Sequence, residues 1–132
     1  MPVADIMTCN LITIAPHLTV GEIQPLFKQH RIHHLLVVEN HTLVGIISDR
    51  DVLRNISPFA RTAAADGKDT FTLSRKAHQI MTTNIISVSP QSGIRDACAT
   101  LLDNRVSLLP VLEEGELVGV LSWKDILRFF LK

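Results

Sequence analysis

The sequence contains few aromatic residues, few cysteines and no excess of charge of either sign. Aromatics make up 5% of the 132 residues, and tyrosine is absent, so the core must be aliphatic. Thirteen basic side chains balance thirteen acidic ones, which argues against a protein that binds the nucleic-acid backbone. No apolar run approaches the roughly 18 residues that cross a membrane, and the first residues do not resemble a charged-then-apolar leader.

An internal repeat organises the sequence. The stretches "LVGIISDRDVLRN" and "LVGVLSWKDILRF" begin at Leu43 and Leu117, and the same offset of 74 residues also relates Pro16 to Pro90. Between residues 6–54 and 80–128 the offset holds over 49 paired positions without a gap, and 17 of the pairs are identical. The chain is therefore a duplicated unit of about fifty residues. Because so short a unit buries little surface alone, we expect the two copies to form one compact module.

Each copy predicts the element order β-α-β-β-α, which gives an α+β fold. Strands are indicated by two β-branched runs that each end at a proline, "NLITIAP" and "NIISVSP". Helical spacing of apolar residues follows over residues 19–31 and 93–105, where Thr19 and Glu22 predict a capping box and Pro25 predicts a kink or a late helix start. Apolar hairpins and short amphipathic helices complete each copy, with polar turns at residues 40–41 and 114–115.

The copies define the expected domain boundaries. Residues 1–56 form the first repeat, residues 57–77 an inter-repeat linker and residues 78–132 the second repeat. The linker is long for a loop, and its last part, from Leu73 to Met81, is expected to be helical. Cys9 and Cys98 do not occupy equivalent positions, and we interpret them as reduced thiols of a cytoplasmic protein.

A glycine, a serine and an aspartate recur at spacings of three in both copies. Gly45 lies within a predicted strand, where glycine indicates a close approach by backbone or ligand. Ser48 follows at the strand-to-helix junction, where free backbone N–H groups can face an anion. Asp51 lies one helical turn further on, and a carboxylate can accept both hydroxyl groups of a ribose. The pattern therefore favours a nucleotide, and the alternative is that the serines only cap their helices.

The ordered set of motifs resembles the tandem cystathionine β-synthase (CBS) domain pair, or Bateman module. The matching segments are "DIMT" with "QIMT", "TIAP" with "SVSP", "RIHHLLVV" with "RVSLLPVL", and "LVGIISDRD" with "LVGVLSWKD". The resemblance covers nearly the whole chain apart from the linker. It implies a pseudo-twofold pair of repeats that binds AMP, ADP, ATP, S-adenosylmethionine or NAD in clefts between the repeats. It also implies a homodimer that regulates a partner protein.

The resemblance implies two sites, each of which combines residues from both repeats. The phosphate and ribose are assigned to the serine and aspartate of one repeat, and the base to the other repeat. The first site comprises Ser48, Arg50 and Asp51 with Thr82, Ile86, Val106, Ser107 and Leu108. The second site comprises Ser122, Lys124 and Asp125 with Thr8, Ile12, Ile32, His33 and His34. If the aspartates bind ribose, their removal should weaken binding with little effect on melting temperature.

The sequence also predicts differences between the two sites. Histidines at 33 and 34 correspond to Ser107 and Leu108, and their charge at lower pH would favour a polyphosphate at the second site. Leu36 replaces a proline that is frequent in the family, and Trp123 could stack on a ring or block it. A metal site is disfavoured, because strand alternation points His33 and His34 to opposite faces.

Three functions follow from these observations. The first is a cytoplasmic sensor that binds an adenosine-containing ligand and signals to a partner protein, with no required cofactor. The second is a ligand-free assembly module, which is favoured by the apolar residues at 126–127 and 129–131. The third is a small enzyme, which is disfavoured because the sequence has no glycine-rich phosphate loop and no histidine close to Ser48.

Overall fold

The computed structural model describes residues 1–56, 67 and 71–132 and divides into two compact units. The first-repeat unit consists of Ile12–Asn84. The second-repeat unit consists of Met1–Leu11 together with Ile85–Lys132. The first eleven residues of the chain therefore belong to the unit that contains the second repeat, a division that the repeat boundaries alone do not show.

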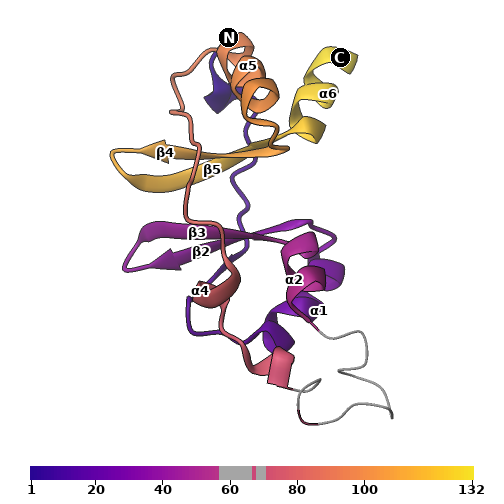
Figure 1. Ribbon diagram of the computed structural model, residues 1–132. Coiled ribbons are helices and arrows are strands. Elements are labelled where there is room, and N and C mark those ends of the chain that lie inside the picture. The colour runs from indigo at the N-terminus through magenta and orange to yellow at the C-terminus, as the bar shows by residue number, and fades with distance from the viewer. Residues whose placement is uncertain (57–66, 68–70) are drawn as a thin grey trace. The chain divides into compact units, whose positions relative to one another are not determined.

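The first-repeat unit follows the predicted element order. Strand β1 pairs in parallel with β2, and β2 pairs antiparallel with β3. In Figure 1, α1, α2 and α4 all lie on one side of the β2–β3 hairpin. The bounds of its elements are β1 Thr13–Ile14, α1 Val20–His30, β2 His34–Glu39, β3 Thr42–Ser48, α2 Asp49–Asn55, the 3-10 helix η2 Thr72–Ser74 and α4 Ala77–Ile80.

The second-repeat unit has the same helices and hairpin in the same order. Its elements are the 3-10 helix η1 Val3–Asp5, α5 Ile94–Asn104, β4 Leu108–Glu113, β5 Glu116–Ser122 and α6 Trp123–Leu131. The first strand predicted for this repeat is reduced to a single parallel bridge from Val88 to Val111. The α+β fold class predicted from the sequence is confirmed.

Both hairpins turn through residues with positive φ. Asn40 and His41 have φ values of 51° and 65°, and Glu114 and Gly115 have values of 52° and 82°. Two successive positive φ angles match the right-handed twist of the strands that the turn connects. The polar turns predicted from the sequence are therefore present in both repeats.

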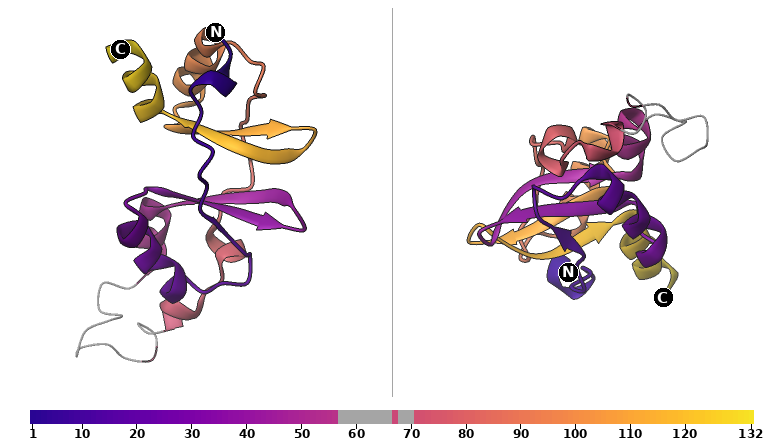
Figure 2. Two further views of the ribbon diagram at one scale, coloured as in Figure 1. Left: turned by 180° about the vertical axis from the view of Figure 1, so that it is seen from behind. Right: turned by 90° about the horizontal axis from the view of Figure 1, so that it is seen from below.

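The "IMT" segment of each repeat packs on the return strand of the other. Thr8 exchanges two backbone hydrogen bonds with Val120 in β5, and Thr82 exchanges two with Ile46 in β3. Figure 2 shows the N-terminal segment, in indigo, beside the β4–β5 hairpin. This exchange explains why the first eleven residues are part of the second-repeat unit.

The strand glycines make room for these segments. A Cβ at Gly119 would lie 2.8 Å from Met7 Sδ and 3.1 Å from the Thr8 carbonyl oxygen. A Cβ at Gly45 would lie 2.7 Å from Met81 Cγ. The close approach that the sequence predicted is therefore made by the methionine side chain of each "IMT" segment.

Each unit has an aliphatic core, as the scarcity of aromatics predicted. Leu35, Val37 and Ile47 are fully buried in the first-repeat unit, where Phe27 is the one aromatic ring among the buried residues that the structure describes. Leu109, Val111 and Leu121 occupy the corresponding positions of the second-repeat unit. Aliphatic side chains of the helices and hairpins therefore fix the two strand-to-helix junctions.

Helix α1 begins where its capping box predicts. The Thr19 side chain accepts a hydrogen bond from the Glu22 backbone N–H, and Glu22 accepts one from the Thr19 N–H. The helix starts at Val20 and continues through Pro25, so the predicted late start is wrong. The capping box, together with burial of Val20 and Ile23, offsets the backbone hydrogen bond that proline removes.

The predicted linker lies largely outside the described residues, which exclude 57–66 and 68–70. Of the helix expected from Leu73 to Met81, the structure contains part of η2 and the single turn α4. Among the described residues, no helix combines the length and apolar character that crossing a bilayer requires.

Candidate ligand-binding sites

The junction between β3 and α2 is closed by a reciprocal pair of hydrogen bonds. The Ser48 N–H donates to Asp51 Oδ2 at 2.8 Å, and the Asp51 N–H donates to Ser48 Oγ at 3.1 Å. This is a capping box in which aspartate takes the place of glutamate. The serine cap, which the sequence left as an alternative to ligand binding, is therefore present. Among the described residues, the one contact of Asp51 Oδ1 is a distant ion pair, at 3.8 Å from Arg54.

The junction between β5 and α6 has the same capping box and two further contacts. Asp125 Oδ2 accepts hydrogen bonds from the Ser122 N–H at 2.9 Å and from the Ser122 hydroxyl at 3.1 Å. Asp125 Oδ1 accepts one from the Thr8 hydroxyl at 2.9 Å and lies 3.4 Å from Arg128 Nη1. Both carboxylate oxygens of Asp125 are therefore engaged within the second-repeat unit.

The two aspartates also differ in burial. The side chain of Asp51 is 21% exposed, whereas that of Asp125 is 5% exposed. A buried charge is costly unless it is fully hydrogen-bonded, and the contacts of Asp125 meet that requirement. The sequence led us to expect little change in melting temperature when either aspartate is removed; from these contacts we now expect the loss of Asp125 to destabilise the second-repeat unit.

Within the first-repeat unit, two histidines lie beside the junction. His34 stands opposite Ser48 in the β2–β3 register, and His33 Nδ1 lies 2.9 Å from Asp49 Oδ2. The hydrogen bond with His33 lowers the pKa of Asp49. Burial lowers the pKa of His34, an effect that Asp49 partly opposes. Burial therefore opposes the positive charge that the sequence interpretation assigned to His34.

The second-repeat unit has apolar or small residues at the equivalent positions. Leu108 stands opposite Ser122 in the β4–β5 register. The Ser107 carbonyl accepts a hydrogen bond from the Trp123 N–H, just as the His33 carbonyl accepts one from the Asp49 N–H. The surroundings of the two junctions therefore differ, and the two histidines lie beside the Ser48 junction of their own unit. Their assignment to the second site, with Ser122, stays a prediction.

The remaining predicted site residues are divided between the two units. Ile12 and Ile32 pack on the core of the first-repeat unit, and Ile86 and Val106 pack on that of the second. The structure brings Thr8 to Asp125, and Thr82 to the strand that leads to Ser48. Each predicted site draws on both units, so the joining of its two halves remains a prediction.

Basic side chains flank both carboxylates at the start of the helices. Arg50 and Lys124 are exposed on the first turns of α2 and α6, where they are accessible to a phosphate group. Trp123, immediately before Lys124, is 40% exposed. No group of three His, Cys, Asp or Glu side chains within the described ranges could hold a metal ion.

Sequence reasoning missed two structural roles. Met7 and Met81 fill the spaces opposite the strand glycines, and Thr8 bonds to a carboxylate 117 residues away in the chain. The repeated "IMT" motif was the available signal, since an identical triplet in both copies suggests a shared packing role. The recurrence could not indicate that the segments are exchanged between the repeats.

The chain belongs to a known protein family. The CBS domain model matches twice, at residues 3–58 and 77–132, so this protein is a member of the CBS domain family and carries two copies of the domain. A similar protein is the CBS domain-containing protein YhcV of Bacillus subtilis (strain 168). It is 30% identical over 124 residues, which cover 94% of this chain and 81% of YhcV.

Solved structures of CBS proteins share the fold. The CBS-domain containing protein ATU1752 from Agrobacterium tumefaciens has a TM-score of 0.80 at 21% identity, covering 98% of this chain and 99% of that one. The CBS domain pair of protein MJ0100 has a TM-score of 0.79 at 24% identity, with coverage of 98% and 95%. That structure is a complex with 5-methylthioadenosine and S-adenosyl-L-methionine. The tandem CBS pair predicted from the sequence is confirmed.

Proposed function

We propose that this protein is a cytoplasmic regulatory module that binds an adenosine-containing ligand and signals to a partner protein, without catalysis. The observation that carries the proposal is the repeated junction in which a serine and an aspartate three residues later meet at a helix start. The candidates are AMP, ADP, ATP, S-adenosylmethionine and NAD. The MJ0100 complex, whose ligands both contain adenosine, supports this class of ligand.

The chemistry of each junction suits the ribose and phosphate of such a ligand. A carboxylate is the side chain that can accept both ribose hydroxyls, and one oxygen of Asp51 has no close partner among the described residues. The exposed guanidinium of Arg50 on the same helical turn supplies positive charge for a phosphate. The Ser48 junction is therefore the better candidate for the first ligand bound.

A thermal-shift panel of the five ligands tests the proposal. A ligand at 100 times its Kd should add about 2.7 kcal/mol to the free energy of unfolding. The melting temperature should therefore rise with at least one of the five and continue to rise with concentration. Guanosine 5'-monophosphate is the matched control, because it has the same ribose and phosphate but a different base. A flat response to all five would reject the proposal.

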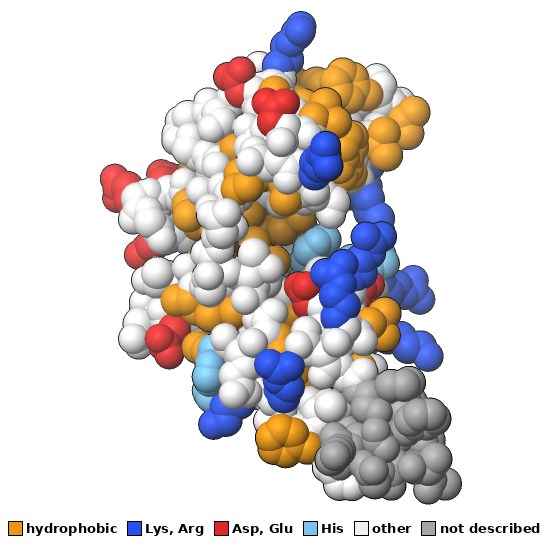
Figure 3. All heavy atoms as spheres, viewed as in Figure 1, with side chains coloured by type: hydrophobic (Ala, Val, Ile, Leu, Met, Phe, Trp, Pro, Cys, Tyr) orange, Lys and Arg blue, Asp and Glu red, His pale blue; other side chains and the backbone are white. Residues whose placement is uncertain are grey.

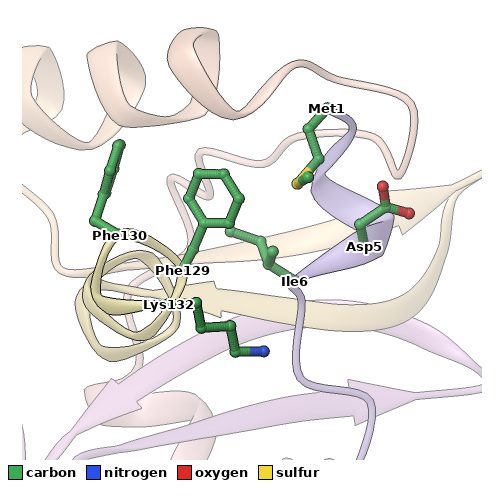
Figure 4. A pocket seen from close by; sticks show the side chains of 6 residues that line it. All are labelled: Met1, Asp5, Ile6, Phe129, Phe130 and Lys132. Carbon is green, nitrogen blue, oxygen red and sulfur yellow. The ribbon is translucent and has the colours of Figure 1, made fainter.

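A ligand-free assembly module is the second candidate, and α6 favours it. Leu127, Phe130 and Leu131 are 56%, 67% and 86% exposed, and apolar side chains gather over this helix in Figure 3. Phe129 and Phe130 also line a hollow of about 560 Å³ with Met1, Asp5, Ile6 and Lys132, shown in Figure 4. Exposed apolar surface of this kind marks protein contacts, and we propose that a second copy of the chain covers it in a homodimer.

A further inference from the structure

The hydroxyl group of Thr8 donates a hydrogen bond to Asp125, the carboxylate that the proposed ligand would bind at the second site. It lies 2.9 Å from Asp125 Oδ1, and the other oxygen is held by the Ser122 N–H and hydroxyl. Within the described ranges, Arg128 Nη1, at 3.4 Å, is the second donor to Oδ1. A ribose could bind Asp125 only if it replaced one of these donors. Thr8 is the donor that it resembles, because both offer an alcohol hydroxyl to the same oxygen.

The first-repeat unit lacks the corresponding contact. Thr82 is the repeat equivalent of Thr8 and makes the same pair of backbone hydrogen bonds, in its case with Ile46. Within the described part of the chain, however, the Thr82 side chain has no hydrogen bond, and Asp51 Oδ1 has only the 3.8 Å contact with Arg54. Two junctions with the same sequence pattern therefore differ in whether a threonine hydroxyl is hydrogen-bonded to the aspartate.

We propose that Thr8 is an intramolecular competitor for the ligand at Asp125, so that the second site is self-occluded while the first is open. This inference rests on the proposed function, since it assumes that a ligand hydroxyl binds the aspartate. It makes Thr8 a residue that sets the difference in affinity between the sites. It also gives Thr8 a role different from the ligand-contacting one that the family resemblance implied.

Occupancy of the second site should then be coupled to the N-terminal segment. Thr8 lies on a segment that is also held by hydrogen bonds from the Val3 N–H to Ser92 O and from the Ala4 N–H to Pro90 O. A ligand that takes Asp125 removes the side-chain bond that ties this segment to α6. The segment should become more mobile when the second site fills. At the first site, the described residues contain no equivalent threonine contact that a ligand would break.

Calorimetry in an Asp51→Asn background isolates the second site. In that background, we expect the Thr8→Val variant to bind AMP or S-adenosylmethionine about tenfold more tightly than the protein that retains Thr8. The reason is that the ligand no longer has to break the charge-assisted hydrogen bond between Thr8 and Asp125. Thr8→Ser keeps the hydroxyl and should stay within about twofold of Thr8. Thr100→Val is the matched control: it removes a threonine hydroxyl of the same unit that donates only locally, to the Asp96 carbonyl oxygen, and it should leave affinity unchanged. A purely structural role would make Thr8→Val bind more weakly.

Hydrogen exchange of the Thr8 and Val120 amides provides the second readout. Saturating ligand should accelerate their exchange in the Asp51→Asn protein, and Thr8→Val should accelerate it without ligand. Equal or weaker binding by Thr8→Val would overturn this inference alone, as would exchange that ligand leaves unchanged. Absence of binding by both compounds in all variants, including the chain with both aspartates, would instead reject the proposed function and this inference with it.

Discussion

At the residue scale, the two aspartates have the same local role but different tertiary contacts. Each closes a capping box with the serine three residues before it. Only Asp125 is buried, and only Asp125 receives a hydrogen bond from the N-terminal segment. A sequence pattern can indicate the capping box, but the Thr8 contact depends on a segment 117 residues away.

This difference predicts unequal costs of substitution. Asp51→Ala should lower the free energy of unfolding by about 1 kcal/mol, the usual value of a helix cap. Asp125→Ala should cost about 2–3 kcal/mol, because it also leaves the Thr8 hydroxyl and Arg128 without their charged partner. Urea denaturation of the two variants without ligand measures both values. Equal costs would show that the Thr8–Asp125 contact contributes nothing to stability.

At the element scale, β2 begins with a histidine, His34, where the equivalent strand β4 begins with Leu108. Burial lowers the pKa of His34 below the ordinary value of about 6.5. The folded protein thus keeps His34 neutral where the unfolded chain binds a proton. The stability that neutral His34 contributes is present above the pKa of this residue in the unfolded chain, and it is lost as the pH falls below about 6.5.

Replacing His34 with leucine, the residue at the equivalent position 108, should reduce this dependence. We expect the wild type to lose more unfolding free energy than His34→Leu between pH 7.5 and pH 5.5, as measured by urea denaturation. The control is His17→Gln, which also replaces a histidine with the residue at the equivalent position of the second repeat, Gln91. This variant retains His34, so it should lose as much unfolding free energy as the wild type over the same pH range. The same pH dependence in His34→Leu would contradict this role for His34.

The elements themselves could be predicted largely because their signals are local. The capping box at Thr19 and the polar turns at residues 40–41 and 114–115 follow from neighbouring residues. The first strand of each repeat was less predictable, because β1 retains two residues and its counterpart a single bridge at Val88. Pairing of such short strands depends on the strand beside them, and no pattern within the segment contains that information.

The exchange of the "IMT" segments was also beyond sequence reasoning. Both triplets were visible as part of the repeat, but a repeat implies that each copy is complete. The structure pairs Thr8 with Val120 and Thr82 with Ile46 instead. Gly45 and Gly119 permit this packing. The sequence indicated a close approach by backbone or ligand at these glycines, but the nearest group in each case is a methionine side chain.

At the scale of the whole molecule, the exposed face of α6 predicts self-association. Light scattering at micromolar concentration should give the mass of a dimer, about twice 14.7 kDa. Phe130→Glu should shift the protein toward the monomer, since a charge would be buried in the contact. Phe71→Glu alters a side chain of similar exposure, 68% against 67%, on the other unit and should leave the dimer intact. A wild-type monomer would reject this prediction.

The central claim is that the repeated serine–aspartate junctions bind an adenosine-containing ligand, and calorimetry on isosteric aspartate variants tests it most directly. The titrant is whichever compound of the panel gives the largest thermal shift. We expect Asp51→Asn and Asp125→Asn each to weaken one binding event at least tenfold, as loss of a charged acceptor implies, and the double variant to show no binding. Undiminished binding by a folded double variant would contradict the account.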